Sequence, residues 1–369
     1  MHVEVKVPEF RVPQAQNQLE PANRRERNPA DTGSGGRSEG HSPVRRFLLA
    51  RGNSAFADTG FHWLMVLCAL SIFGIVALIV WELLKGSDLA WANFHLGFFY
   101  KSYTDTYSGQ TSYWDPVNGQ FSAVPFVYGT LVSSFLALLI AVPLSIGVAI
   151  FITEMCPEFL RGPLSFLTEL LAAIPSIVYG LWAFFVLVPL LRVHVNPLLT
   201  AVFGWTGLFS DDNPTGLGFT AASIILAIMI LPIISSLTRE VMTAVPHSQR
   251  EAVLALGATR WEMIRMGVLR NARIGIVGGI ILGLGRALGE TMAVTMVIGN
   301  SPEIHRSLLS NGTSMASVLA NEFAEAVSDM HRSALIEIGL ALFIVTIIVN
   351  AMARLLVWAV TRGAPAHTH

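Results

Sequence analysis

Two charged residues, Arg286 and Glu290, lie near the middle of an otherwise apolar stretch at residues 274–300. A charge inside a bilayer is costly, so such a residue usually faces protein or water and has a partner. Residues four apart share one face of a helix, which makes these two side chains each other's expected partner. A guanidinium binds a tetrahedral oxyanion through paired hydrogen bonds and stays charged. The pattern indicates a transport pathway in which Arg286 meets an anion and Glu290 neutralises the arginine when the site is empty.

The same two residues also allow a second interpretation, a static ion pair that fixes helix packing. On a helical wheel with roughly 100° per residue, four residues lie within about 40° of Gly279. They are Gly275, Gly283, Arg286 and Glu290. Glycines four apart let the backbone of another helix approach closely. We therefore expect one unbroken helix whose packing seam also carries its charges.

The composition is that of a membrane protein. Hydrophobic residues make up 53% of the 369 residues and charged residues only 13%, against about 25% charged in soluble domains. The net charge of −1 excludes the dense basic surface of a nucleic-acid-binding protein. The two cysteines imply no disulfide framework, and the scattered histidines show no metal-ligand spacing.

Six segments are long and apolar enough to span a bilayer as helices. They are residues 63–81, 126–153, 166–191, 219–237, 274–298 and 334–360. The third is expected to be kinked or split at Pro175. In the sixth, Glu337 and Arg354 are expected to reach the membrane interface. We expect an all-α polytopic membrane protein with a disordered tail at residues 1–60 and a transmembrane domain at 61–365.

Lysine and arginine alternate in frequency between successive loops. Nine precede the first span and six follow the fourth span, whereas the loops on the other side hold five in all. By the positive-inside rule, both termini are predicted to be cytoplasmic.

The loop at about residues 240–272 has the pattern of two short helices with a hinge at Gly257. A compact basic knob outside the bilayer suits docking to a peripheral subunit. An ordinary basic surface loop that only sets the topology remains the alternative.

Within this loop, EAVLALG at residues 251–257 resembles the EAA loop of ABC-transporter permeases. In this stretch the three residues Glu251, Ala252 and Gly257 match the pattern, and Leu269 matches it further along the loop. Val253 replaces its second alanine, and Gly267 and Arg270 replace the later isoleucine and proline. The resemblance implies that the three matching residues belong to a coupling helix that inserts into a groove of an ATPase.

Longer motifs are more specific. ELLAAIPSIVYG at residues 169–180 and GLGRALGETMAV at 283–294 resemble the permease subunits of high-affinity phosphate ABC importers, in the binding-protein-dependent transport system inner-membrane component family. The resemblance implies the type I importer fold in a bacterial inner membrane, with phosphate as substrate and Arg286 and Glu290 active in transport. It also implies a second homologous permease subunit, an ATPase subunit dimer and an extracytoplasmic phosphate-binding protein.

The chain is expected to be non-catalytic. Its only lysines are Lys6, Lys85 and Lys101, and none lies in a phosphate-binding P-loop. ATP is therefore expected to be used by a partner, with no cofactor bound by this chain. A permease for molybdate, sulfate or another oxyanion fits the same charges. An ion-coupled secondary transporter or channel remains a competing class, although the docking loop argues against it.

Overall fold

The protein is described from a computed structural model that covers residues 54–104, 111–210, 213 and 215–361. The chain divides into a unit of residues 1–69 and a unit of residues 70–369, and helix α2 (Ser54–Gly86) crosses the division. Most of the predicted tail, residues 1–53, lies outside the described residues, and residues 54–60 belong to α2.

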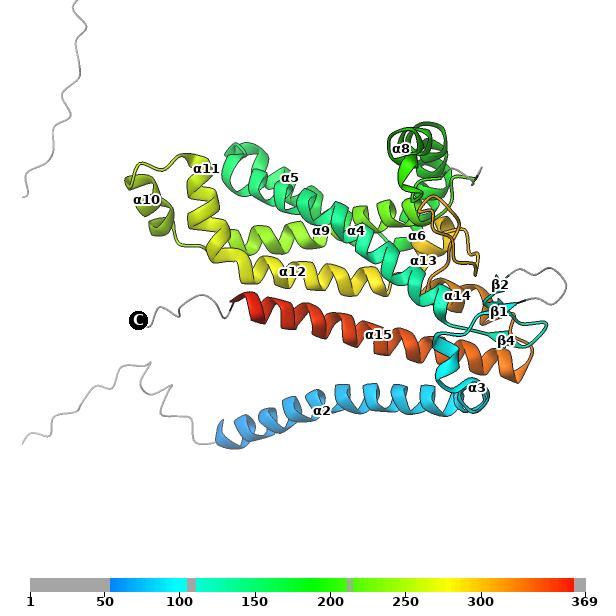
Figure 1. Ribbon diagram of the computed structural model, residues 1–369. Coiled ribbons are helices and arrows are strands. Elements are labelled where there is room, and N and C mark those ends of the chain that lie inside the picture. Colours follow the sequence, from blue (N-terminus) through cyan, green and yellow to red (C-terminus); the bar gives the residue numbers. More distant parts are fainter. Residues whose placement is uncertain (1–53, 105–110, 211–212, 214, 362–369) are drawn as a thin grey trace, which may run out of the picture. The chain divides into compact units, whose positions relative to one another are not determined.

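The second unit is built mainly from helices (Figure 1). Before the second span come α3 (Asp88–Phe94), the 3-10 helix η1 (His95–Phe99) and two antiparallel strand pairs, β1 (Tyr103–Thr104) with β2 (Thr111–Ser112) and β3 (Trp114–Asp115) with β4 (Gln120–Phe121). There follow α4 (Val124–Ile150), the π-helix η2 (Phe151–Met155), α5 (Glu158–Ala173), α6 (Ser176–Trp182), the π-helix η3 (Ala183–Leu187), α7 (Val188–Leu190), the π-helix η4 (Leu191–Val195), α8 (Asn196–Phe203) and the 3-10 helix η5 (Gly204–Thr206). The chain continues with α9 (Phe219–Thr243), α10 (His247–Ala255), α11 (Arg260–Glu262), the π-helix η6 (Met263–Leu269), α12 (Arg270–Leu288), α13 (Met292–Val297), α14 (Met315–Glu322) and α15 (Asp329–Thr361).

The prediction of six membrane-spanning helices is confirmed for the described residues. The predicted bounds of the third span are wrong. The structure places a separate helix, α5, before Pro175 and the span itself at Ser176–Thr206. Pro175 adopts extended backbone angles and Ile174 ends α5, because a residue that precedes proline is driven out of the helical region. The chain is therefore split at Pro175.

Helices α4, α9 and α12 pack against one another, and α9 is the most buried of the spans (Figure 1). Small residues recur every four positions along α4 and all are buried: Gly129, Ser133, Ala137, Ala141, Ser145 and Ala149. Small side chains let helix backbones approach closely in a membrane. Ser145 Oγ donates a hydrogen bond to the Leu231 carbonyl of α9 at 3.1 Å, which ties the two helices together.

The predicted glycine seam of α12 lies against α9. A Cβ added at Gly275 would stand 2.4 Å from Val241 Cγ2, and one at Gly283 would stand 2.8 Å from Ile234 Cδ1. At Gly279 the nearest atom would be Leu237 Cβ, at 3.3 Å. The three glycines thus lie where two helices of the same chain approach each other closely.

We expect Gly275→Ala to lower the melting temperature of the detergent-solubilised protein. The new methyl group meets the stiff, β-branched Val241, and overpacking of this kind costs about 1–3 kcal/mol. Gly278→Ala is the matched control, since its Cβ meets nothing within 4 Å. Replacing a helical glycine by alanine normally stabilises by about 0.5–1 kcal/mol. Equal melting temperatures for the two variants would contradict the close approach at Gly275.

Glu337 of α15 does not reach the membrane interface, contrary to expectation. Its side chain is 1% exposed, and neither carboxyl oxygen has a hydrogen-bond partner among the described residues. The helix begins at Asp329, before the predicted start of the span at residue 334, so Glu337 lies deeper in the packed helices.

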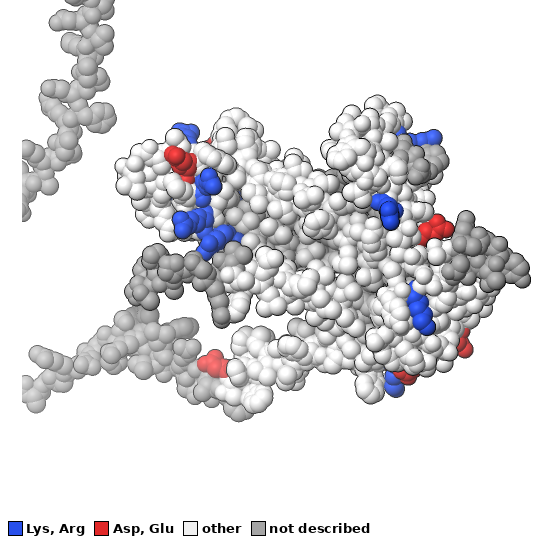
Figure 2. Space-filling view, viewed as in Figure 1, with Lys and Arg blue, Asp and Glu red and all other residues white. Residues whose placement is uncertain are grey.

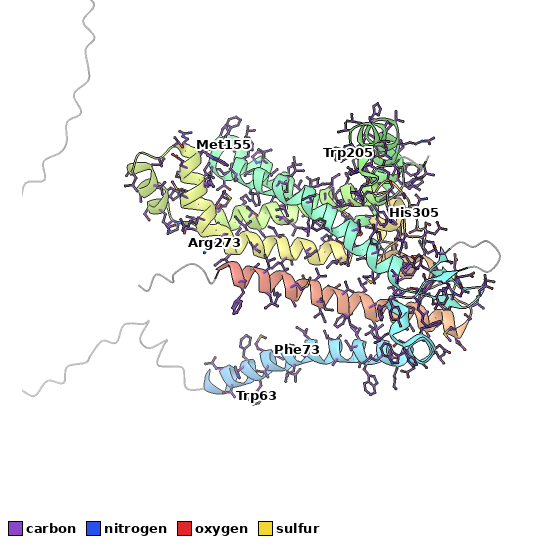
Figure 3. The ribbon with its side chains drawn as sticks, in the orientation of Figure 1. Trp63, Phe73, Met155, Trp205, Arg273 and His305 are labelled. Atoms are coloured by element: carbon purple, nitrogen blue, oxygen red, sulfur yellow. The ribbon has the colours of Figure 1, made fainter. Side chains whose placement is uncertain are left out.

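The end of the unit opposite α10 is closed by polar contacts between loops and helices. Trp114 Nε1 donates to Glu322 Oε2 at 2.8 Å, and His331 Nε2 lies 3.0 Å from the same oxygen. The His331 ring stacks on Phe121. Figure 3 shows Trp205 and His305 at this end and Met155 and Arg273 at the end that carries α10.

Candidate translocation and coupling sites

The helix that carries Arg286 ends two residues later. Helix α12 stops at Leu288, and α13 begins at Met292. Glu290 Oε1 accepts a hydrogen bond from the Ala293 amide at 3.4 Å, so this carboxylate caps the start of α13. Such side-chain capping competes with continuation of a helix. The prediction of one unbroken helix over residues 274–298 is therefore wrong.

The break also separates the predicted charge pair. Within the described residues, no hydrogen bond or ion pair joins Arg286 to Glu290. An i, i+4 contact needs an unbroken helix between its two residues, and this one ends at Leu288. The expectation that Glu290 holds Arg286 in place is not met in this structure.

Arg286 lies in the last turn of α12, where the carbonyl end of the helix favours a cation. Its side chain is exposed and lines a cavity of about 540 Å3 between α12, α9 and α15. Asn350 and Arg354 of α15 line the same cavity, and none of its lining residues is acidic. The guanidinium therefore faces an open, positively charged space.

A second helix break lies beside the first. Helix α6, which begins just after Pro175, packs closely on α13: a Cβ at Gly180 would stand 2.7 Å from Met296 Sδ and 3.0 Å from Ala293 Cα. The Tyr179 hydroxyl donates to the Leu171 carbonyl at 2.8 Å across the Pro175 break. Discontinuous helices mark binding sites in many membrane transporters. Of these two breaks, the sequence predicted the one at Pro175 and missed the one before α13.

The predicted coupling loop forms α10, a turn at Gly257 and α11. Glu251 and Ala252 lie on α10 with their side chains exposed. Gly257 ends the first helix with a φ of +84° and has open space around it. Thr259 and Glu262 form a capping box that starts the next helix. The three residues that match the EAA pattern therefore lie on an accessible surface.

Two departures from the EAA pattern lie against each other. A Cβ at Gly267 would stand 3.4 Å from Val253 Cγ2, so a larger side chain at one position faces a smaller one at the other. Arg270, which replaces the proline, lies in a helical run that continues from Arg260 to Leu288. The chain makes no turn at Arg270. The three residues that depart from the pattern leave the exposed face of α10 unchanged.

Large apolar side chains are exposed around this loop. Leu256 is 89% exposed, Trp261 59% and Leu254 42%. Figure 2 shows arginine side chains gathered over the same end of the molecule. An exposed apolar patch with a charged rim is typical of a protein–protein contact site.

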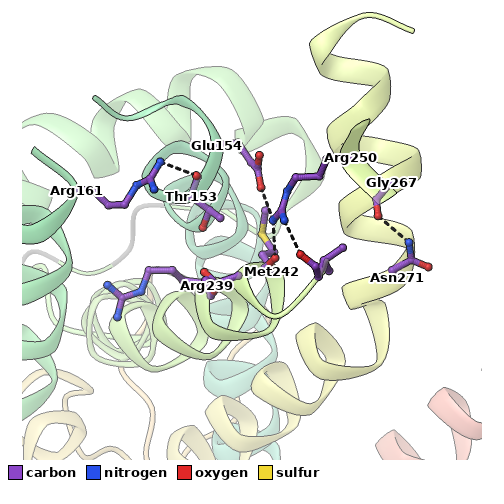
Figure 4. A network of polar contacts seen from close by, with 10 residues as sticks. Thr153, Glu154, Arg161, Arg239, Met242, Arg250, Gly267 and Asn271 are labelled. Atoms are coloured by element: carbon purple, nitrogen blue, oxygen red, sulfur yellow. Dashed lines mark hydrogen bonds and ion pairs between the residues drawn. The ribbon is translucent and has the colours of Figure 1, made fainter. Parts of the chain in front are cut away.

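The base of α10 is tied to the membrane helices by a nearly buried ion pair that sequence reasoning missed (Figure 4). Arg250 Nη2 donates to Glu154 Oε1 at 3.0 Å and to the Met242 carbonyl at 2.8 Å. The two charged side chains are 11% and 9% exposed. Glu154 lies in η2, at the end of α4, so the pair links α4 and α9 to the coupling helix.

Two further arginines hold α5 at this end. Arg161 Nη2 donates to the Thr153 carbonyl at 3.1 Å (Figure 4). Arg239 of α9 pairs with Glu169 of α5 at 2.6 Å. The second pair is partly exposed and contributes at most about 1 kcal/mol. These contacts fix the direction of α5 as it enters the membrane-spanning helices.

Comparison with known proteins places this arrangement in a family. The family model described as "Binding-protein-dependent transport system inner membrane component" matches residues 141–362, more than half of the chain. The chain belongs to this family. Its members are inner membrane components, so the chain is a multi-pass inner membrane protein, with six candidate spans among the described residues.

Within the family, the chain is similar to the PstC permeases. It is 43% identical over 322 residues to the phosphate transport system permease protein PstC of Mesorhizobium japonicum, covering 86% of this chain and 93% of that protein. With PstC of Haemophilus influenzae the identity is 44% over 308 residues, covering 83% and 94%. The resemblance to the permease subunits of phosphate importers, first seen in the motifs, is thus confirmed.

Solved structures agree on the fold. A chain of the bacterial alginate ABC transporter, solved with an alginate-bound periplasmic protein, matches with a TM-score of 0.53 at 15% identity, covering 81% of this chain and 95% of that chain. At this identity the likeness shows the fold alone, which is the helical fold of an ABC transporter membrane subunit.

Proposed function

We propose that this chain is the membrane-spanning subunit of an ATP-driven phosphate importer and forms half of its translocation pathway. The observation that carries the proposal is the 43% identity to a PstC permease over 93% of that protein's length. Arg286 supports it independently, because an arginine that faces a cavity without acidic lining residues is suited to bind an anion. In this proposal, Arg286 meets the phosphate ion in transit, and Glu290 shapes the break beside it.

A half-pathway needs partners. Since this chain has no nucleotide-binding P-loop, we assign ATP hydrolysis to a separate ATPase subunit dimer and no cofactor to this chain. A second, homologous permease subunit completes the pathway, and an extracytoplasmic phosphate-binding protein delivers the ion. The lysine and arginine distribution supports cytoplasmic termini, so the α10 end of the unit faces the cytoplasm.

The coupling loop connects the motor to the pathway. In this proposal the ATPase binds the exposed face of α10, including Glu251 and Ala252, and the apolar patch around Leu256. Movement of α10 is passed to α4 and α9 through the Arg250–Glu154 pair. Breaking a buried ion pair by removing one partner costs about 3–5 kcal/mol, so the link is stiff enough to transmit force.

Uptake of labelled phosphate by the reconstituted complex tests the function. Proteoliposomes loaded with ATP should accumulate phosphate when the binding protein is added outside, and an excess of sulfate or molybdate should not compete. Competition by either anion, with little phosphate accumulated, would assign the chain to another oxyanion. ATP-independent accumulation driven by an ion gradient would assign it to the secondary transporters.

A further inference from the structure

The cavity beside Arg286 holds more positive charge than one arginine supplies. Arg286 of α12 and Arg354 of α15 both line it, together with the carboxamide of Asn350. None of the three side chains makes a hydrogen bond or ion pair with another part of the described chain, and no acidic residue lines the cavity. Three polar side chains thus converge on one space without a counterion.

An anion would stabilise such an arrangement within membrane-spanning helices. Each charge in a bilayer costs a few kcal/mol or more, and two cations in one cavity repel each other. A phosphate group relieves both costs, because each guanidinium donates a pair of hydrogen bonds to its oxygens and the asparagine amide donates another. A cavity of about 540 Å3 has room for the ion and water.

The two arginines lie at different depths. Asn350 stands opposite Gly285, since a Cβ on that glycine would lie 4.0 Å from Asn350 Nδ2. At 1.5 Å rise per residue, Arg354 is about 6 Å further along α15. That direction leads toward the end of α15 at Thr361, which the proposed topology places at the cytoplasm.

We propose that Asn350 and Arg354 extend the Arg286 position into a two-arginine site for a phosphate group, with Arg354 as its second, inner contact. The direction of passage, from Arg286 to Arg354, rests on the proposed phosphate import. The site itself rests on the side chains that line the cavity. Two sources could supply the phosphate group, the free ion in transit or the headgroup of an anionic phospholipid.

Cysteine labelling of the purified complex tests the site without any transport measurement. Gly278→Cys puts a thiol into the cavity at a position with nothing within 4 Å, in a chain whose Cys68 and Cys156 are replaced by serine. A negatively charged thiosulfonate should label it about tenfold faster than a positively charged one. Arg354→Gln should remove most of that preference, whereas Arg332→Gln, on the same helix but outside the cavity, should leave it unchanged.

The source of the phosphate group, free ion or lipid headgroup, is determined from which of the two slows labelling of the introduced cysteine. In phosphatidylcholine nanodiscs, added inorganic phosphate should slow the labelling at least about threefold, and Arg354→Gln should abolish the protection. Protection that appears only with phosphatidylglycerol in the nanodisc would support the site and assign it to a lipid headgroup. Labelling that ignores reagent charge, phosphate and phosphatidylglycerol would overturn the proposal. Leu282→Cys repeats the experiment from a second lining position if the first variant assembles poorly.

Measurements of phosphate uptake then distinguish a failure of the two-arginine site from a failure of the proposed import function. In reconstituted complex, Arg354→Gln should lower the rate of phosphate uptake about tenfold, and Arg354→Lys should restore part of it because the charge remains. Unchanged uptake in Arg354→Gln would remove this residue from the pathway and leave the import function intact. Protection by phosphate in a wild-type complex that transports none would leave the site intact and reject import.

Discussion

Arg286→Gln is expected to reduce phosphate uptake by the reconstituted complex at least about 100-fold. The glutamine is neutral, and hydrogen bonds to a charged group contribute about 1.5–3 kcal/mol each, so losing a bidentate pair is enough for this loss. The uptake rate of Arg286→Lys should lie between those of the wild type and Arg286→Gln. Lysine keeps the charge but lacks the planar guanidinium that matches a phosphate. The initial rate of labelled-phosphate uptake is measured for the wild type and the two variants under the same conditions.

The control for this variant is assembly. Arg286 makes no hydrogen bond or ion pair within the described residues, so its loss should not change the recovery of the partner subunits or the melting temperature. Arg332→Gln, an exposed arginine at the start of α15, should transport normally. If Arg286→Gln instead prevents assembly, the arginine has an architectural role and the transport assignment fails.

Gly257→Pro is expected to uncouple ATP hydrolysis from transport. Gly257 has a φ of +84°, which proline cannot adopt because its ring fixes φ near −65°. The turn between α10 and α11 must then change, and the exposed face that carries Glu251 and Ala252 is displaced from its place on the ATPase. We expect uptake and the stimulation of ATP hydrolysis by the binding protein both to fall at least about tenfold.

A conservative change at the same position is the matched control. Asparagine tolerates a left-handed backbone better than other non-glycine residues, so Gly257→Asn should keep most of the coupling. Glu251→Lys, which reverses one charge on the exposed face without touching the backbone, should weaken coupling as well. Normal coupling in both Gly257→Pro and Glu251→Lys would show that the ATPase docks elsewhere.

Much of the fold follows from local sequence features. The six spans could be located because an apolar run long enough to cross a bilayer is a property of the segment itself. Gly257 could be identified as the end of a helix because a left-handed residue at that position favours glycine. The glycine repeat of α12 marked a close helix contact, but only the structure identified its partner as α9, through Val241, Leu237 and Ile234.

The errors have a common cause. The helical wheel placed Arg286 and Glu290 on one face because it assumed an unbroken helix, whereas Glu290 caps a new helix at α13. The split at Pro175 was predicted correctly, but the apolar run at 166–191 did not show that α5 is a separate helix and that the span itself runs from Ser176 to Thr206. Hydropathy measures whether a segment prefers lipid and says nothing about where its backbone breaks inside the membrane.

From its sequence alone, this chain is a six-span permease with an arginine in a membrane helix and a docking loop between its fourth and fifth spans. These properties depend on composition, spacing and motifs within single segments. The tertiary structure decided which side chains meet: the packing of α6 against α13 beside their two helix breaks, the Arg250–Glu154 pair and the cavity shared by Arg286 and Arg354. Each joins residues from different helices, and such contacts arise only when the helices pack.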